Sequence, residues 1–243
     1  MKNDLVINLK NKIILITGGY GHLGKGIVNS LLAHDAEVYV LGRSIEKFKE
    51  AFDSDHRESL FFQHCDISDA ESINNAIGVI FSRKNRIDAF INNAYYLKGN
   101  SPEDMTDNDF IYSIEGTLTA CFKSIKTLIP IMKKQGYGKI INVSSMYGVV
   151  APDFSVYDDS PQFFNPPPYG PAKAGLIQLT KYYASYLGKY NINVNAISPG
   201  PFPSETVQKD GGFIKKLESK TALKRIGKPS DLGGIFVLLC SDA

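Results

Sequence analysis

Two side chains four residues apart, Tyr169 and Lys173, could carry proton-transfer chemistry. The segment from Tyr169 to about Gly188 has a helical pattern, and residues four apart project from one face of a helix. A free tyrosine has a pKa of about 10, but a nearby positive charge favours the phenolate. Tyr169 could therefore act as a general acid or base. A buried tyrosine beside a solvated lysine, with no catalytic role, is a common alternative for such a pair. Other residues of the sequence have to distinguish between these two interpretations.

A glycine-rich stretch near the start of the chain could hold the phosphates of a nucleotide. The apolar run from Ile13 breaks after Thr17 into a turn with four glycines, and Lys25–His34 has apolar residues at helical spacing. In a dinucleotide-binding unit, such a turn lets the backbone approach a pyrophosphate at a helix N-terminus. Ordinary strand-to-helix turns also use glycine. The predicted contacts are Gly18, Tyr20, Gly21, His22, Leu23 and Gly24.

The end of the next predicted strand bears on which dinucleotide binds. Glu37–Leu41 runs into Gly42 and Arg43. An acidic residue here would accept hydrogen bonds from a free ribose 2′-hydroxyl, whereas an arginine pairs with a 2′-phosphate. Since Gly42 offers no carboxylate, Arg43 favours NADP(H) over NAD(H). A solvated surface arginine is the simpler alternative.

Strands and helices alternate along the rest of the chain. Further strands are expected at Ser59–His64, Ile87–Ile91, Lys139–Val143 and Asn193–Ile197, and further helices from the 66–69 turn to about Ser82, over Thr106–Lys134 and over Ser230–Cys240. This alternation predicts a single α/β domain over residues 1–243, a three-layer, Rossmann-type, doubly wound parallel sheet. The proline-rich segment 149–168 interrupts the pattern and is expected to be a loop.

Candidate binding residues follow three of the other predicted strands, because the carboxyl ends of parallel strands form the binding edge of such a sheet. Asp66 could accept a hydrogen bond from an adenine amino group, although helix capping explains an acidic turn equally well. Adjacent asparagines after the fourth strand are also typical of a plain turn. The candidates are Asp66, Ile67, Asn93, Ala94, Pro199, Gly200 and Ser204.

Composition argues against several classes of partner. The 243 residues include 27 basic and 25 acidic side chains, a formal net charge of +2, so nothing marks a surface for nucleic acid or an anionic membrane. The three cysteines and four histidines lack the spacing of a disulfide framework or a metal site. No leader-like segment follows Met1, and no apolar run could cross a bilayer. We therefore expect a cytoplasmic protein with a small-molecule substrate.

Taken in order, these motifs resemble the short-chain dehydrogenase/reductase family in its compact single-domain branch. The resemblance implies that Ser145 and Tyr169 are catalytic and that Lys173 lowers the tyrosine pKa and holds the nicotinamide ribose. It also implies that Ser204 contacts the nicotinamide carboxamide. The anchors, spread over Lys12–Ala243, are Thr17–Gly24, Asn92–Ala94, Ser145, Tyr169-x-x-x-Lys173 and Asn195–Gly200.

Four features depart from the family pattern. His22 stands where the compact branch has a glycine, and the spacing with Gly21 is similar to the extended, sugar-nucleotide-modifying branch. Ser113 stands for the asparagine that usually holds a proton-relay water, so it is a fourth catalytic candidate. An insertion separates Ser145 from Tyr169, and the closing glycine-rich strand of the family is missing after Ala243, which would leave a sheet edge exposed.

The leading hypothesis is an NADP(H)-dependent oxidoreductase that interconverts a carbonyl group and a secondary alcohol. A sugar or sugar-nucleotide substrate is one candidate, because residues 144–153 are similar to oxidoreductases of bacterial flagellin-modification and surface-sugar pathways. Two alternatives stay open. One is a cofactor-binding regulatory or scaffold protein without turnover, and the other is an epimerase or dehydratase that recycles its cofactor.

Two further predictions concern the neighbours of Tyr169. The inserted segment, residues 149–168, is tethered at the catalytic residues and is expected to act as a lid. The helix that begins at Tyr169 carries one apolar stripe for the sheet and a second stripe of tyrosines. Relatives pair through this helix, so a homodimer or homotetramer is expected. The two stripes are Leu176, Leu179, Tyr183 and Leu187, and Tyr182, Tyr186 and Tyr190.

Overall fold

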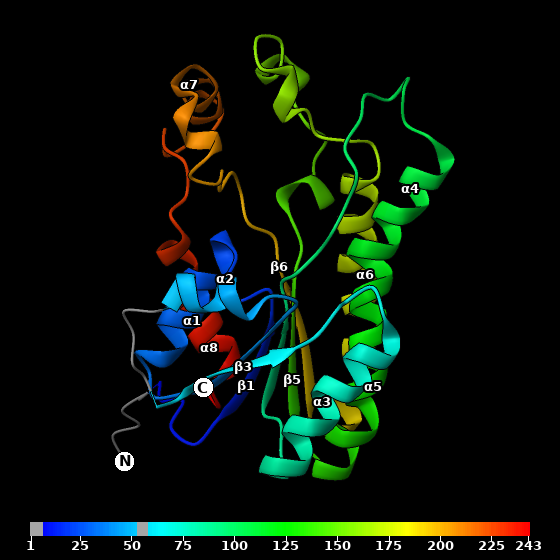
Figure 1. Ribbon diagram of the computed structural model, residues 1–243, viewed down its shortest axis with the longest axis vertical. Coiled ribbons are helices and arrows are strands. Elements are labelled where there is room, and N and C mark those ends of the chain that lie inside the picture. The colour runs from blue at the N-terminus through cyan, green and yellow to red at the C-terminus, as the bar shows by residue number, and fades with distance from the viewer. Residues whose placement is uncertain (1–6, 53–57) are drawn as a thin grey trace.

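A six-stranded parallel sheet lies at the centre of the molecule (Figure 1). The computed structural model describes residues 7–52 and 58–243, and its strands are β1 (Ile13–Thr17), β2 (Glu37–Gly42), β3 (Leu60–His64), β4 (Ala89–Asn92), β5 (Gly138–Val143) and β6 (Ile192–Ile197). All neighbours pair in parallel in the order β3-β2-β1-β4-β5-β6. The predicted doubly wound sheet is confirmed. Its order reverses between β1 and β4, where such sheets open a crevice.

Helices cover both faces of the sheet (Figure 1). Each face has its own apolar core, because successive residues of a strand point to opposite sides: Ile14 and Ile16 of β1 lie in one core, and Ile13 and Leu15 in the other. All three cysteines are buried and free. The first face is covered by α1 (His22–Leu32), α2 (Ile45–Phe52) and α8 (Gly233–Cys240), and the second by α3 (Ala70–Lys84), α5 (Ala120–Gln135) and α6 (Tyr169–Leu187).

The long helical segment predicted over Thr106–Lys134 contains a local defect. Thr106 caps α4 (Asp107–Ile114), and α4 passes into α5 through a π-helical turn, Glu115–Thr119. Gly116 in this turn has no room for a side chain, because the carbonyl oxygen and ring of Tyr96 lie against it. Turns of this kind are frequent at functional sites.

Two helices were missed in the sequence, and one begins later than predicted. α2 is short, has charged residues at half of its positions, and buries only Phe52. α7 (Gly211–Ser219) opens on two glycines, each of which disfavours a helix by about 1 kcal/mol, but the Asp210 side chain accepts a hydrogen bond from the Phe213 N–H at 3.0 Å. The last helix was predicted from Ser230, yet Pro229–Leu232 forms a 3₁₀ turn and α8 follows it.

The inserted segment, residues 149–168, contains only two short 3₁₀ turns, Phe154–Val156 and Pro161–Phe163. It packs against α7 at the end of the molecule toward which the strands run (Figure 1). No helix in residues 7–52 or 58–243 is long and apolar enough to span a membrane.

Candidate functional site

A cavity of about 830 Å³ lies at the carboxyl ends of the strands. It brings together three of the four predicted catalytic residues, Ser145, Tyr169 and Lys173, while Ser113 is not part of its wall. All of the predicted cofactor-binding residues also line it: Gly18, Tyr20, Gly21, His22, Leu23, Gly24, Arg43, Asp66, Ile67, Asn93, Ala94, Tyr169, Lys173, Pro199, Gly200 and Ser204. Within the described ranges, no group of three or more His, Cys, Asp or Glu side chains could hold a metal ion.

The glycine turn between β1 and α1 fits the phosphates of a dinucleotide. Gly18 has φ +64°, a conformation that other residues rarely adopt, and a Cβ atom at Gly24 would collide with the carbonyl oxygen of Gly18. Gly21 is the N-cap residue of α1, and no side chain caps the first N–H groups of the helix. A helix N-terminus with free N–H groups on a cavity is an anion-binding feature.

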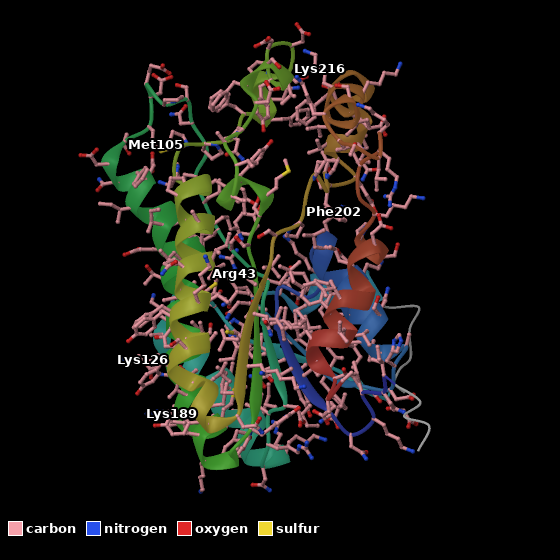
Figure 2. The ribbon with its side chains drawn as sticks, turned by 180° about the vertical axis from the view of Figure 1, so that it is seen from behind. Arg43, Met105, Lys126, Lys189, Phe202 and Lys216 are labelled. Atoms are coloured by element: carbon pink, nitrogen blue, oxygen red, sulfur yellow. The ribbon has the colours of Figure 1, made fainter. Side chains whose placement is uncertain are left out.

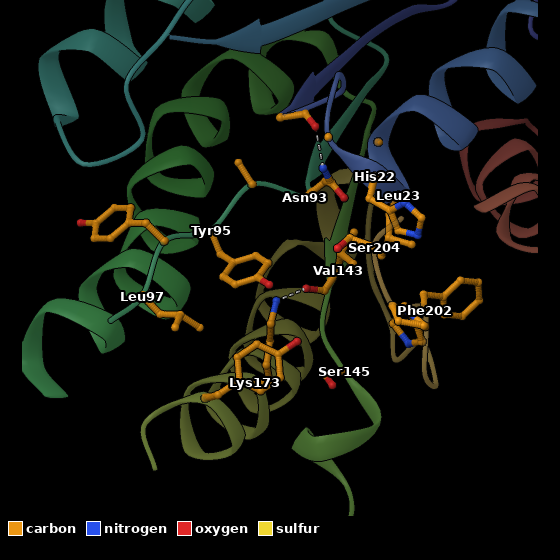
Figure 3. Close-up of a pocket in the computed structure, with 18 of the residues that line it drawn as sticks. His22, Leu23, Asn93, Tyr95, Leu97, Val143, Ser145, Lys173, Phe202 and Ser204 are labelled. Carbon is orange, nitrogen blue, oxygen red and sulfur yellow. Dashed lines mark hydrogen bonds between the residues drawn. The ribbon is translucent and has the colours of Figure 1, made fainter. Parts of the chain in front are cut away.

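Thr17 and Asn93 tie this turn to the end of β4. The Thr17 hydroxyl oxygen accepts hydrogen bonds from the N–H groups of Asn93 at 3.1 Å and Ala94 at 3.0 Å. The Asn93 side-chain amide donates to the carbonyl oxygens of Thr17 at 3.0 Å and Gly18 at 3.1 Å (Figure 3). Adjacent asparagines suggested only a plain turn after β4. The Asn93 side chain instead fixes the shape of the glycine turn.

Tyr20 explains why Gly42 carries no side chain. The Tyr20 ring lies where a Cβ atom of Gly42 would be, and its hydroxyl accepts a hydrogen bond from the Arg43 N–H at 3.1 Å. The Arg43 side chain is exposed beside the cavity, and its charge contributes to a lowered pKa of Asp66. Burial raises the Asp66 pKa, but hydrogen bonds from Ser68 outweigh burial and are the main cause of the net lowering. No acidic side chain can therefore stand at the end of β2 while Tyr20 keeps this place.

The loop after β5 places Ser145 against the start of α6. The Ser144 hydroxyl donates to the carbonyl oxygen of Lys173 at 2.9 Å. A Cβ atom at Gly148 would lie 2.8 Å from the backbone of Lys173, so only glycine allows this close packing. The Ser145 hydroxyl accepts a hydrogen bond from the Tyr147 N–H at 3.1 Å, which fixes its position on the cavity wall.

Lys173 is nearly inaccessible, with 3% of its surface exposed. Its ammonium group donates to the carbonyl oxygen of Val143 at 2.7 Å and lies 4.9 Å from the centre of the Tyr95 ring (Figure 3). Burial disfavours the charged form and lowers its pKa from 10.5 to about 8. Lys173 therefore still carries its charge at neutral pH, but holds its proton less tightly than a surface lysine.

The expectation of a lowered Tyr169 pKa is not met by the protein's own groups. Burial raises the pKa of Tyr169 to about 12, the neighbouring Tyr95 adds to the rise, and a hydrogen bond with Ser145 opposes it. Lys173 lies 5.7 Å from the ring centre of Tyr169 and directs its proton to Val143 instead. Desolvation therefore keeps the phenol protonated, as a proton donor requires.

Ser113 does not supply a free hydroxyl to the site. It is buried, accepts a hydrogen bond from the Lys98 N–H at 3.0 Å and donates to the Asp109 carbonyl oxygen at 2.7 Å. One helical turn later, in the π-helical turn that packs against α6, the Thr117 hydroxyl is buried without a partner among the described residues. Thr117 therefore places this buried hydroxyl in the turn, and the π-helical turn itself was not visible in the sequence.

The loop after β6 and the start of α1 complete the wall. The Pro199 carbonyl oxygen accepts a hydrogen bond from the Met146 N–H at 2.9 Å, which joins this loop to the loop of Ser145. His22 lines the cavity, and its Nε2 atom is buried without a partner among the described residues. Burial lowers the pKa of His22, while Glu205 opposes that shift, so the imidazole is neutral at pH 7.

Comparisons with known proteins agree with this architecture. A family profile described as Enoyl-(Acyl carrier protein) reductase matches residues 21–243. The trans-4-hydroxycyclohexanecarboxylate dehydrogenase of Sinomonas cyclohexanicum is 32% identical over 239 residues, 95% of this chain and 86% of that protein. The post-translational flagellin modification protein A of Campylobacter coli is 28% identical over 242 residues, 96% of this chain and 93% of that protein. The predicted likeness to flagellin-modification proteins is confirmed.

Among solved structures similar to this chain, one holds NADP and another holds NAD⁺. The structure of ElxO with NADP bound has a TM-score of 0.83 and 27% identity, covering 95% of this chain and 92% of that one. A short-chain dehydrogenase from Leptospira borgpetersenii with bound NAD⁺ has a TM-score of 0.82 and 30% identity, covering 97% and 87%. Similarity therefore supports a nicotinamide dinucleotide without choosing between the two.

Replacing Lys173 by methionine should raise the free energy of unfolding at neutral pH. Below pH 8 both the folded and the unfolded chain carry the Lys173 charge, so the folded state bears the full cost of burying it, ~3 kcal/mol for a pKa shift of this size. Between pH 8 and 10.5 only the unfolded chain still holds this proton, so parental stability rises toward that of the variant.

Urea unfolding at neutral pH and at about pH 9.5 measures this difference. The exposed Lys181→Met on the same helix is the matched control and should show no pH-dependent difference. A Lys173→Met variant that is equally destabilised at both pH values contradicts the prediction.

Proposed function

The chain belongs to the short-chain dehydrogenase/reductase family of oxidoreductases, and from that premise we propose that it uses NADP(H) to interconvert a carbonyl group and a secondary alcohol. The observation that carries the proposal is one cavity wall that joins Ser145, Tyr169 and Lys173 to an uncapped helix N-terminus. This arrangement also supports turnover over the regulatory or scaffold alternative. We further propose the cytoplasmic location expected from the sequence.

The protein's own groups handle the proton and the developing charge. When bound, the nicotinamide cofactor supplies the hydride in reduction and accepts it in oxidation. In reduction the Tyr169 hydroxyl donates its proton to the substrate oxygen as negative charge develops there. Ser145 donates a second hydrogen bond to the same oxygen. The Lys173 charge stabilises the Tyr169 phenolate that remains.

Changing Tyr169 to phenylalanine should lower turnover by about two to four orders of magnitude, because the proton donor is lost while the ring stays in place. Binding of NADPH should be nearly unchanged. Steady-state NADPH oxidation with a proven ketone and a separate NADPH titration measure the two quantities. Tyr112→Phe, on the exposed side of α4, is the control. If the Tyr169→Phe variant turns over at the parental rate, Tyr169 is not the proton donor and another group supplies the proton.

The end of β2 supports NADP(H) as the preferred cofactor. Tyr20 excludes an acidic side chain at Gly42, and the Arg43 guanidinium lies exposed beside the cavity. A charge-assisted hydrogen bond from arginine to a phosphate contributes about 1.5 to 3 kcal/mol. Such a contribution corresponds to roughly one to two orders of magnitude in affinity.

Arg43→Leu should weaken NADPH binding by about ten- to a hundredfold and leave NADH binding unchanged. Fluorescence titration of each dinucleotide measures the dissociation constants. The exposed Arg83→Leu, in the last turn of α3, is a control of equal charge change. If Arg43→Leu weakens the binding of both dinucleotides equally, Arg43 has a structural role. If the parental protein binds NADH as tightly as NADPH, or more tightly, the proposed preference is refuted.

The outer face of α6 supports a homodimer. Tyr182 is 62% exposed and Tyr186 is 45% exposed, and their rings stack with centres 6.3 Å apart. Lys133 of α5 lies over the Tyr186 and Tyr190 rings, at 4.7 and 4.2 Å from their centres. Exposed tyrosine rings are typical of residues that become buried in an interface.

The double variant Tyr182→Glu, Tyr186→Glu should shift the protein from dimer to monomer at micromolar concentration, because two carboxylates would be desolvated in the interface. Light scattering after size exclusion measures the mass. Leu223→Glu, 76% exposed beyond α7, is the control and should remain dimeric. A monomeric parental protein, or a double variant that stays dimeric, contradicts the assignment.

A further inference from the structure

An aromatic roof covers the substrate end of the cavity. We use this name for residues 149–168 together with α7, two segments that lie side by side near Lys216 in Figure 2. Phe163 and Phe213 have ring centres 4.7 Å apart, and Tyr157 lies 5.8 Å from Phe213. Tyr157 and Phe213 are buried in an apolar cluster of their own. The roof is therefore a packed unit in which the inserted segment, residues 149–168, contacts α7.

Rings from the floor of the cavity face this roof. The Tyr147 and Tyr157 hydroxyls are 3.1 Å apart, which joins the roof to the loop of Ser145. The Tyr95 ring is half exposed to the cavity and lies 5.9 Å from the Tyr169 ring. Six aromatic side chains thus line the space next to the catalytic residues: Tyr95, Tyr147, Tyr157, Phe163, Phe164 and Phe213.

The charged side chains on the cavity wall lie elsewhere. Arg43 and Asp66 follow the ends of β2 and β3, and the neutral His22 begins α1, where the dinucleotide would bind. Of the roof's own charges, Lys216 pairs with Asp159 at 2.6 Å and Asp153 pairs with Lys220 at 2.7 Å. Among the described residues that line the cavity, only Lys173 brings a charge next to the six rings, and its ammonium group is already bonded to a backbone carbonyl.

From this enclosure we propose that the substrate is an uncharged ketone or secondary alcohol built on an apolar ring, an inference that rests on the proposed function. An apolar ring gains by leaving water and by packing edge or face against the aromatic side chains. A phosphate, diphosphate or carboxylate would lose its hydration here without meeting a cation that could replace it. The site therefore disfavours the sugar-nucleotide substrate that the sequence left open.

Two ketones with the same ring test this inference: 4-methylcyclohexanone and 4-oxocyclohexanecarboxylate. The Tyr169→Phe variant saturated with NADPH allows binding to be measured by calorimetry while turnover is suppressed. The neutral ketone should bind at least about tenfold more tightly than the carboxylate. Equal or tighter binding of the carboxylate, or no binding of the neutral ketone, overturns the inference.

Turnover of the parental protein separates this inference from the proposed function. If the neutral ketone binds but is not reduced by NADPH, the proposed function fails while the substrate class stands. If the carboxylate or a keto-sugar phosphate is reduced with the higher kcat/KM, the substrate class fails while the proposed function stands.

A roof variant tests which residues make the selection. Phe163→Leu should raise KM for 4-methylcyclohexanone by about tenfold with kcat nearly unchanged, because contacts with the apolar ring bind the substrate and the transition state equally. The small acyclic ketone butanone should show little change. The exposed Val149→Ala in the same segment is the matched control. Equal loss of kcat/KM for both ketones indicates general damage to the roof and contradicts this role for Phe163.

Discussion

Four hydrogen bonds between Thr17, Gly18, Asn93 and Ala94 join the carboxyl ends of β1 and β4 at the point where the strand order reverses. The two strands pair along the sheet, but their connections leave this point in opposite directions. Beyond the paired strands, a side-chain hydroxyl and a side-chain amide supply the link. Because the glycine turn, the α1 N-terminus and the loop of Tyr95 all start from these residues, the geometry of the whole cavity depends on this junction.

Desolvation sets the protonation states of the catalytic pair. Burial opposes charge on both groups, so it lowers the pKa of Lys173 and raises that of Tyr169. The result is a neutral phenol beside an ammonium group that stays charged at pH 7. A phenol in this state is prepared to give a proton, and the reverse step requires a second positive charge near the ring. The direction of proton transfer can thus follow the charge of what the cavity binds.

The amino-acid sequence predicted the parts of this protein that depend on local patterns. Apolar runs and glycine turns were enough for the six strands, their parallel arrangement, and a tyrosine and a lysine on one helix that both line the cavity. Ser113 lies outside the cavity wall, and its hydroxyl is bonded to backbone groups of Lys98 and Asp109. The π-helical turn that follows it breaks the regular helical spacing that a sequence-based prediction assumes. α7 was missed because its stability comes from packing against residues 149–168, a contact between distant segments.

The aromatic roof has a small apolar cluster of its own, separate from the two cores that flank the sheet. Such a cluster can loosen or repack without global unfolding, since local units of a fold have their own stability. Residues in it can therefore vary at little risk to the sheet, the glycine turn or the catalytic residues. A lineage carrying this chain could change what it recognises by drift in two short surface segments, while inheriting its chemistry unchanged.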